Sequence, residues 1–291
     1  VPRGTPFVFN VQDVFPDVAV ELGAITDERV IAVASWLERF LYRRADAVTV
    51  LSDDLRDNVA AKLRGDRPGR VRVIPNFVDT ERIRPAEREN RYRAEYDLSG
   101  RTVVMYAGNV GLSQSLDLVV AAARRAVERG RDDVVFVVNG GGSSRADLIA
   151  SADGLENLRF VDMQPRERLP EVLAAADVHV VPLKRGLARS SVPSKLYSIL
   201  AAGRPVVASV DAGTEVATTI ERAGAGISVP PEDVDAFVAA LDELVDDPAR
   251  RESMGRSGRS FVEGWVSPAA VGAAYERLFE EVRTEHWRRR G

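Results

Sequence analysis

The chain has 291 residues, of which 45% are hydrophobic, so it can bury one large core or two smaller ones. This composition excludes a disordered chain, a disulfide-stapled miniprotein and a fibrous repeat. Forty basic and 44 acidic residues give a net charge of −4 without a block of like charge, which disfavours a nucleic-acid binder.

Several classes of protein are excluded by what the sequence lacks. No apolar run approaches the length of a membrane span, and the first residues lack the pattern of a signal peptide. We therefore expect a cytoplasmic protein, with a possible peripheral place at the inner face of the plasma membrane. With no cysteine and two histidines, disulfides, cysteine nucleophiles and zinc sites of cysteine and histidine are excluded. Three of the basic residues are lysines, Lys62, Lys184 and Lys195.

Short β-branched runs alternate with segments of helical period, which predicts an α/β fold with parallel sheets. The pattern before residue 79 predicts strands at 7–11, 47–51 and 71–74, and helices at 27–44 and 53–63. The polar, arginine-rich segment 79–101 is interpreted as an interdomain linker. Six further strands, enough for a complete doubly wound domain, are expected at 103–107, 134–139, 158–161, 178–182, 206–209 and 226–229. A last helix over 268–290 has one apolar face and needs a surface to cover.

A glycine turn follows the strand expected at 103–107 and includes Gly108, Asn109 and Gly111. Such a turn can direct free main-chain N–H groups at an anion, although a plain strand-to-helix turn has the same residues. A dinucleotide fold would need a further glycine and an acidic residue after the next strand, where this chain has Asn139. A nicotinamide dehydrogenase is therefore disfavoured.

The segment 184–209 gathers Arg185, Arg189 and Ser194 just before a helix that begins near Lys195. A cation in the first turn faces the positive end of the helix dipole, which costs roughly a few tenths of a kcal/mol. A bound anion would make the position of this cation favourable instead. The alternative is a solvated lysine on an exposed turn.

Three motifs together resemble the retaining, nucleotide-sugar-dependent glycosyltransferases of family 4. They are ValIleProAsnPheValAsp at 73–79, GlyArgProValValAlaSer at 203–209 and GluLeuValAspAspProAlaArgArgGluSerMetGlyArgSerGlyArg at 243–259. Two more, PheAsnValGlnAspValPhePro at 9–16 and ValProSerLys at 192–195, are most similar to the branch that builds surface polysaccharides, such as colanic-acid and O-antigen fucosaminyl transferases. The resemblance implies a GT-B fold with a truncated N-terminal, acceptor-side domain at 1–82 and a C-terminal, donor-binding domain at 83–267. It further implies that 268–291 is a helix crossing back to the N-terminal domain.

The resemblance also implies a donor site. Lys195 and the start of its helix would neutralise the donor diphosphate, Asp13 would lie near the transferred sugar or cap a helix, and Glu215 would reach sugar or ribose hydroxyls. The base would be read mostly by backbone groups around Met163 and Gln164. The other residues expected to bind the donor are Gly108, Asn109, Gly111, Arg185, Arg189, Ser194 and Ser198.

The chain departs from the family pattern at charged positions. Ser190 and Ser198 stand where the family often carries two glutamates, and Asn109 and Gln114 stand where it carries arginine and lysine. Fewer cations are then left for the phosphates, so Lys195 must do more of the neutralisation.

We expect transfer without a metal or cofactor, because no Asp-x-Asp motif lies in a suitable position. In this reaction charge grows on the leaving diphosphate, where cations and helix dipoles stabilise it. The departing phosphate oxygen would take the proton of the acceptor.

The helix at 27–44 combines apolar and basic residues, namely Trp36, Phe40, Leu41, Arg39, Arg43 and Arg44. This pattern is typical either of a helix on a membrane surface or of a helix that covers a sheet. We favour the second interpretation.

The sequence thus predicts a glycosyltransferase that uses a UDP- or GDP-sugar and a glycan acceptor, expected to be lipid-linked, in surface polysaccharide biosynthesis. The alternatives are an inactive nucleotide-sugar-binding subunit and a nucleotide-sugar epimerase on the same scaffold.

Overall fold

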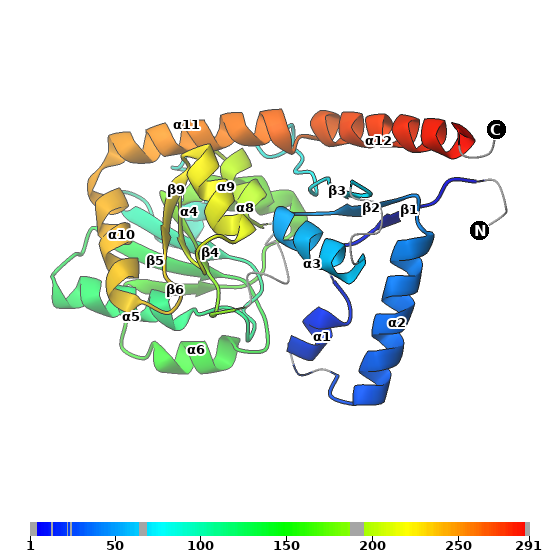
Figure 1. Ribbon diagram of the computed structural model, residues 1–291. Helices are drawn as coiled ribbons and strands as arrows, with labels where there is room; N and C mark the ends of the chain where they lie inside the picture. Colours follow the sequence, from blue (N-terminus) through cyan, green and yellow to red (C-terminus); the bar gives the residue numbers. More distant parts are fainter. Residues whose placement is uncertain are drawn as a thin grey trace. The chain divides into compact units, whose positions relative to one another are not determined.

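The computed structural model describes residues 5–12, 14–21, 23, 25–63, 69–186 and 195–288 (Figure 1). Two compact units are present. The first is built from the chain up to Phe77 together with the C-terminal helix, and the second from the chain between Val78 and Ser267. Each contains a parallel sheet with helices, so the α/β class expected from the sequence is confirmed.

The first unit has a three-stranded parallel sheet in the order β1-β2-β3. Its strands are β1 (Val8–Asn10), β2 (Ala47–Val50) and β3 (Val71–Val73), and its helices are α1 (Asp17–Glu21), α2 (Glu28–Arg44), α3 (Asp53–Leu63) and α12 (Pro268–Arg288). Alternation along β2 sends Val48 and Val50 into the cluster that contains Leu55 of α3. On the other face, Ala47 packs with Leu278 of α12. The apolar stripe of the last helix therefore covers this sheet.

Helix α2 buries a polar face. Glu38 and Tyr42 are buried, and the Tyr42 hydroxyl donates to Glu38 Oε1 at 2.8 Å. Lys62 Nζ of α3 donates to both oxygens of Glu38, at 2.8 and 2.9 Å, and to Asp17 Oδ1 at 2.9 Å. Because each buried charge has a partner of opposite sign, this network can replace an apolar contact.

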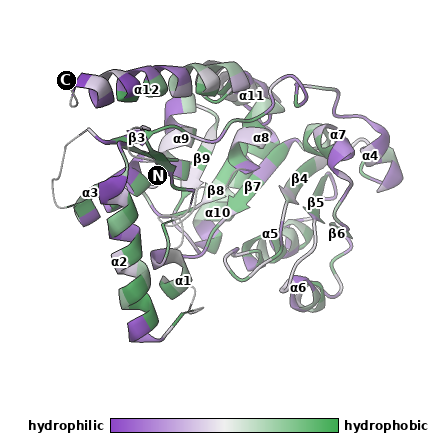
Figure 2. Cartoon of the chain, turned by 90° about the vertical axis from the view of Figure 1, so that its right-hand side faces the viewer, coloured by the Kyte–Doolittle hydropathy of each residue, from purple (hydrophilic) through white to green (hydrophobic). Residues whose placement is uncertain are grey.

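The opposite face of α2 carries its apolar stripe. Val33 is 66% exposed and Trp36 60% exposed, and the Phe40 ring stacks on that of Trp36 with centroids 5.6 Å apart. Figure 2 shows hydrophobic residues along α2. The expectation that these aromatic residues cover a sheet is wrong, because Glu38 and Tyr42 take that place. Within the described residues, no helix is both long enough and apolar enough to cross a bilayer.

The second unit has a six-stranded parallel sheet in the order β6-β5-β4-β7-β8-β9, the doubly wound order expected from the sequence. Its strands are β4 (Thr102–Ala107), β5 (Val134–Asn139), β6 (Leu158–Val161), β7 (Val178–Pro182), β8 (Val206–Ser209) and β9 (Gly226–Val229). Its helices are α4 (Arg91–Glu95), α5 (Asp117–Glu128), α6 (Arg145–Ser151), α7 (Leu169–Ala175), α8 (Lys195–Ala201), α9 (Glu215–Ala223), α10 (Val234–Asp246) and α11 (Pro248–Trp265), with a short 3-10 turn, η1, at Arg166–Arg168.

The two faces of this sheet are covered by different helices (Figure 1). Val104 and Tyr106 point to the face covered by α5, α6 and α10. Val103 and Met105, which alternate with them along β4, point to the face covered by α4 and α7. The sheet is thus buried on both sides, which explains its nearly continuous apolar runs.

The interpretation of residues 79–101 as a linker is wrong. This segment contains α4, whose Tyr92 is fully buried, and Arg93 is only 3% exposed. Arg93 Nη2 donates to Asp177 Oδ2 at 2.5 Å, and the same oxygen accepts from the main-chain N–H of Val103 at 2.8 Å. An arginine-rich segment can therefore pack on a sheet when a buried carboxylate forms an ion pair with one of its arginines.

Helix α11 packs closely against the turn that follows α8, and a glycine makes this possible. A Cβ added to Gly255 would lie 2.2 Å from the carbonyl oxygen of Gly203, whereas one added to Gly264 on the same helix would meet nothing within 4 Å. The close approach of the two backbones therefore requires glycine at the first position only.

We predict opposite effects of alanine at these two glycines. Gly255→Ala should lower the free energy of unfolding by about 2 kcal/mol, because the backbones must move apart. Gly264→Ala should leave it unchanged or raise it by about 0.5 kcal/mol, because alanine restricts the unfolded chain. Urea unfolding followed by circular dichroism measures both, and equal stability of the two variants would contradict the packing described.

Candidate nucleotide-sugar site

A cavity of about 410 Å³ lies in the second unit where β4, β5 and β6 end. The residues that line it include Gly108, Asn139, Met163, Gln164, Lys195 and Ser198. In doubly wound folds, ligands bind outside the carboxyl ends of the strands, which is where this cavity opens. The structure therefore brings together five of the residues expected to bind the donor, and adds Asn139.

Lys195 supplies a positive charge in this cavity. Its Nζ donates to the hydroxyl of Tyr106 at 2.8 Å and lies 4.3 Å from the centroid of the same ring. It also lies against the backbone, because a Cβ added to Gly108 would be 3.1 Å from Nζ. Burial lowers the pKa of Lys195 to about 8, since the charged form is poorly solvated there.

The surroundings of Lys195 contrast with those of Lys62. Lys62 is paired with the carboxylates of Asp17 and Glu38. Within the residues that the structure describes, no carboxylate lies within ion-pair distance of Lys195 Nζ. A half-buried ammonium held only by neutral groups is a site that favours an anionic ligand.

The glycine loops after β4 and β5 are pressed together. A Cβ on Gly140 would lie 1.8 Å from the carbonyl oxygen of Gly108, so only glycine fits there. The N–H of Gly108 donates to the carbonyl of Asn139 at 3.0 Å, and that of Val110 to the carbonyl of Gly141 at 2.8 Å. The N–H of Gly111 donates to Gln114 Oε1 at 3.0 Å. The expectation of a turn with free N–H groups is wrong at these three positions, because the paired loops use them internally.

Two polar side chains of the cavity are fixed by other residues. Asn139 Oδ1 accepts from the Tyr92 hydroxyl at 2.8 Å. Gln164 Nε2 donates to the Tyr96 hydroxyl at 3.1 Å, and its Oε1 accepts from Arg168 at 2.8 Å. The amide group of Gln164 is therefore occupied, which leaves the main chain beside it to contact a ligand.

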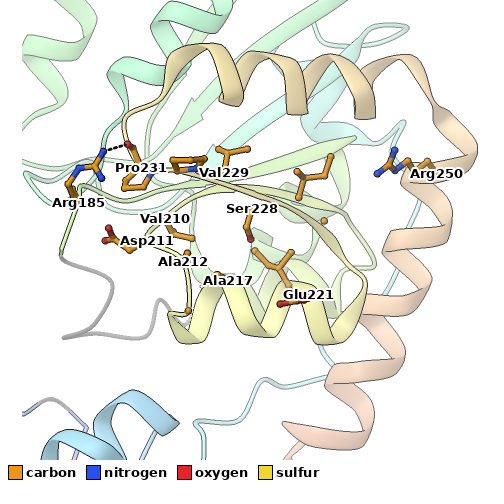
Figure 3. A pocket seen from close by; sticks show the side chains of 15 residues that line it. Arg185, Val210, Asp211, Ala212, Ala217, Glu221, Ser228, Val229, Pro231 and Arg250 are labelled. Carbon is orange, nitrogen blue, oxygen red and sulfur yellow. Dashed lines mark hydrogen bonds between the residues drawn. The ribbon is translucent and has the colours of Figure 1, made fainter.

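Arg185 lies in a different, larger cavity, of about 720 Å³, beside the edge strand β9 (Figure 3). Its guanidinium donates to the carbonyl oxygen of Pro231 at 3.1 Å. Glu215 lines neither cavity among the described residues and accepts from the Thr219 hydroxyl at 3.1 Å at the start of α9. Among the described residues, neither Arg185 nor Glu215 lines the cavity that contains Lys195.

The remaining residues of the expected site fall elsewhere. Gly111 lines a third cavity, of about 270 Å³, together with Gln114 and Lys184. The carbonyl of Asn109 accepts from the Tyr106 hydroxyl at 2.5 Å, and the same hydroxyl accepts from Lys195 Nζ. Outside the described residues lie Asp13, Ser190, Arg189 and Ser194.

Sequence reasoning missed Tyr106 and Arg166, and it considered Asn139 only as evidence against a dehydrogenase. Arg166 lines the cavity from the loop after β6. Tyr106 and Asn139 stand at or next to the ends of strands that both begin as runs of valine. Both are polar residues near the carboxyl end of a buried strand, and this position alone could have predicted a place in the site.

Comparison with known proteins gives the family. Residues 101–247 match the family described as "Glycosyl transferases group 1", and residues 1–76 match the "Glycosyl transferase 4-like domain". The chain belongs to glycosyltransferase family 4. WcaI of Escherichia coli (strain K12), a glycosyl transferase assigned to colanic acid biosynthesis, is 31% identical over 252 residues, which cover 83% of this chain and 60% of WcaI.

A second relative supports the same family, and a solved structure supports the same fold. The alpha-D-kanosaminyltransferase of Streptomyces kanamyceticus is 28% identical over 86% of this chain and 64% of its own length. HepE of Anabaena, solved in complex with UDP, is 14% identical with a TM-score of 0.75, over 95% of this chain and 72% of HepE. The fold is therefore GT-B, as the sequence predicted. The chain spans 60% and 64% of the lengths of the two curated relatives.

We predict that Lys195→Met stabilises the family 4 protein at neutral pH. The pKa of Lys195 is lower in the folded protein, about 8, than its ordinary value of 10.5, so the unfolded chain holds the proton more tightly. Removing the charge should raise the free energy of unfolding by about 1 kcal/mol at pH 7. The gain should shrink between pH 8 and 10.5, where the wild-type protein itself becomes more stable.

Lys62→Met is the matched control for this stability measurement. It removes the partner of Glu38 and Asp17, and should lower the free energy of unfolding by about 2 kcal/mol or more. Urea titrations at pH 7 and pH 9.5 compare the variants. Destabilisation by Lys195→Met at pH 7 as large as that by Lys62→Met would contradict the uncompensated charge at Lys195.

Proposed function

We propose that the protein transfers a glycosyl group from a UDP- or GDP-sugar to a hydroxyl of a glycan acceptor, with retention of anomeric configuration, in surface polysaccharide biosynthesis. The observation that carries this proposal is the ammonium of Lys195, which has a neutral hydrogen-bond partner and faces a cavity large enough for a nucleotide. Membership of family 4 and the likeness to colanic-acid WcaI support it.

The chemistry needs a group that stabilises the leaving diphosphate. The bond from the sugar C1 to the β-phosphate oxygen breaks, and a bond from C1 to the acceptor oxygen forms. The acceptor proton passes to the departing phosphate oxygen. Lys195, aimed at the diphosphate, would favour this step because negative charge increases on the leaving group as the bond breaks. The step as written uses neither a nucleophile of the enzyme nor a metal ion.

Nucleotide binding should depend on Lys195 and on pH. UDP and GDP are screened by thermal shift, and a ligand at a hundred times its Kd should stabilise the protein by about 2.7 kcal/mol. Lys195→Met should weaken binding of the active nucleotide at least about tenfold, as expected for a charge-assisted hydrogen bond. Affinity should fall as the pH rises through about 8, because the ammonium then loses its proton.

Lys184→Met is the control, since Lys184 lines a different cavity. It should leave nucleotide affinity unchanged. No stabilisation by either nucleotide, or equal loss in both variants, would contradict the assignment of the site. Among proteins that bind, recovery of a changed but unattached sugar would identify an epimerase, and binding without any product would identify an inactive subunit.

We further propose that the acceptor is lipid-linked and that α2 meets it at the membrane surface. Trp36 and Phe40 are exposed on one face of α2, and the guanidinium of Arg44 lies 5.8 Å from the Phe40 ring. Within the described part of the chain, neither Arg43 nor Arg44 forms an ion pair with a carboxylate. An apolar stripe with an arginine border fits an anionic lipid surface.

This surface predicts binding to anionic vesicles. The protein should float with vesicles that contain phosphatidylglycerol more than with pure phosphatidylcholine, and less at high salt. The double variant Trp36→Ser and Phe40→Ser should lose this binding. Phe279→Ser, which removes an exposed aromatic ring from α12, should retain it. Equal binding by the double variant and the Phe279 control would contradict a role for α2.

A further inference from the structure

Tyr106 holds the ammonium of Lys195 in one orientation. The carbonyl of Asn109 can only accept, so the Tyr106 hydroxyl donates its single proton there, at 2.5 Å. The phenol oxygen then accepts from Lys195 Nζ, at 2.8 Å. This bond uses one of the three donors of the ammonium. Two donors remain for a ligand in the cavity.

The ring of Tyr106 restricts the ammonium further. Tyr106 is fully buried in the core cluster under α5, so its ring has a fixed position. Nζ lies 4.3 Å from the ring centroid and against the backbone of Gly108, where an added Cβ would be 3.1 Å from it. Attraction to the ring face and the hydrogen bond therefore act on the same cation from a rigid strand.

The choice of a phenol has an electrostatic consequence. A carboxylate in this place would form an ion pair with Lys195 and would repel a phosphate. Burial raises the pKa of Tyr106, so the phenol remains neutral and can hold the ammonium without cancelling its charge. Lys62 shows the other arrangement in the same chain, with two carboxylates and no free charge to offer a ligand.

We infer that Tyr106 is a positioning residue for nucleoside diphosphate binding: its neutral hydroxyl and ring fix the protonated amine of Lys195 toward the diphosphate. This inference rests on the proposed function of the cavity. It does not make Tyr106 a catalytic residue, because its hydroxyl contacts Lys195 and the carbonyl of Asn109, and Tyr106 is not among the described residues that line the cavity.

The sequence offers a direct way to observe Lys195. With three lysines in the chain, selective labelling of lysine with carbon-13 gives three side-chain signals, and Lys195→Arg identifies the relevant one. Its chemical shift, followed against pH, measures the protonation of this one amine. The measurement needs neither activity nor a bound ligand. If Tyr106 had only a structural role, its loss would not change the titration midpoint of Lys195.

Tyr106→Phe removes only the hydroxyl and keeps the packed ring. Because the ammonium then loses an acceptor that stabilises its charged form, the titration midpoint of Lys195 should move below the wild-type value. UDP or GDP should bind about fivefold to tenfold more weakly at pH 7, as expected for one lost hydrogen bond to a charged group. The affinity should also begin to fall at a lower pH than in the wild-type protein.

Tyr197→Phe is the matched control. Tyr197 is a buried tyrosine two residues beyond Lys195 on α8, and the described residues that line the cavity do not include it. This variant should keep the wild-type midpoint and the wild-type affinity. Urea unfolding of both variants checks that the fold is retained.

The outcomes separate this inference from the proposed function. If the wild-type protein binds nucleotide and Lys195→Met weakens binding, but Tyr106→Phe leaves both the Lys195 midpoint and the affinity unchanged, the role of Tyr106 is overturned and the site stands. If the wild-type protein binds neither UDP nor GDP, the proposed function fails. If Tyr106→Phe does not fold, the inference is tested instead by the pH titration of Lys195 in the wild-type protein. A Lys195 midpoint near the ordinary value for lysine, unchanged by nucleotide, would overturn the inference.

Discussion

The proposed donor site depends on one charge, the ammonium of Lys195, that no carboxylate of the described residues neutralises. Lys195 is half-buried at the start of α8, and the Tyr106 hydroxyl is its hydrogen-bond partner within the described chain. Burial of an ammonium among neutral groups costs stability unless an anion completes the site. A protein under selection for stability alone would carry an apolar residue here, and this cost is the reason for which we propose an anionic ligand at Lys195.

The packing of the glycine loops explains why a side chain must provide this charge. Gly140 brings the loop after β5 against the backbone of Gly108, and the N–H groups of Gly108 and Val110 are consumed by the pairing of the two loops. Main-chain amides that bind phosphate in other folds are therefore used here to build the cavity wall. The wall is rigid as a result, and its positive charge comes from Lys195.

The strands were predictable from the sequence, and the contacts between distant residues were not. The short apolar runs at 103–107 and 134–139, both of which start with two valines, predict buried parallel strands from local sequence alone. The prediction that the aromatic residues of α2 cover a sheet was wrong because Lys62 forms an ion pair with the buried Glu38 of that helix. The prediction that residues 79–101 form a linker was wrong because Arg93 forms an ion pair with the buried Asp177. Each of these pairs joins residues more than twenty positions apart. Lys195 was found because a cation at a helix start is locally unfavourable, whereas Tyr106, 89 positions earlier, gave no local signal.

A crystal structure of the protein with UDP or GDP tests the central claim most directly. We predict a diphosphate in the cavity formed by the ends of β4, β5 and β6, with a phosphate oxygen about 2.8 Å from Lys195 Nζ and the hydrogen bond from Nζ to the Tyr106 hydroxyl retained. A nucleotide bound in this cavity while Nζ points to bulk solvent, or a diphosphate held only at the edge-strand cavity of Arg185, would contradict it.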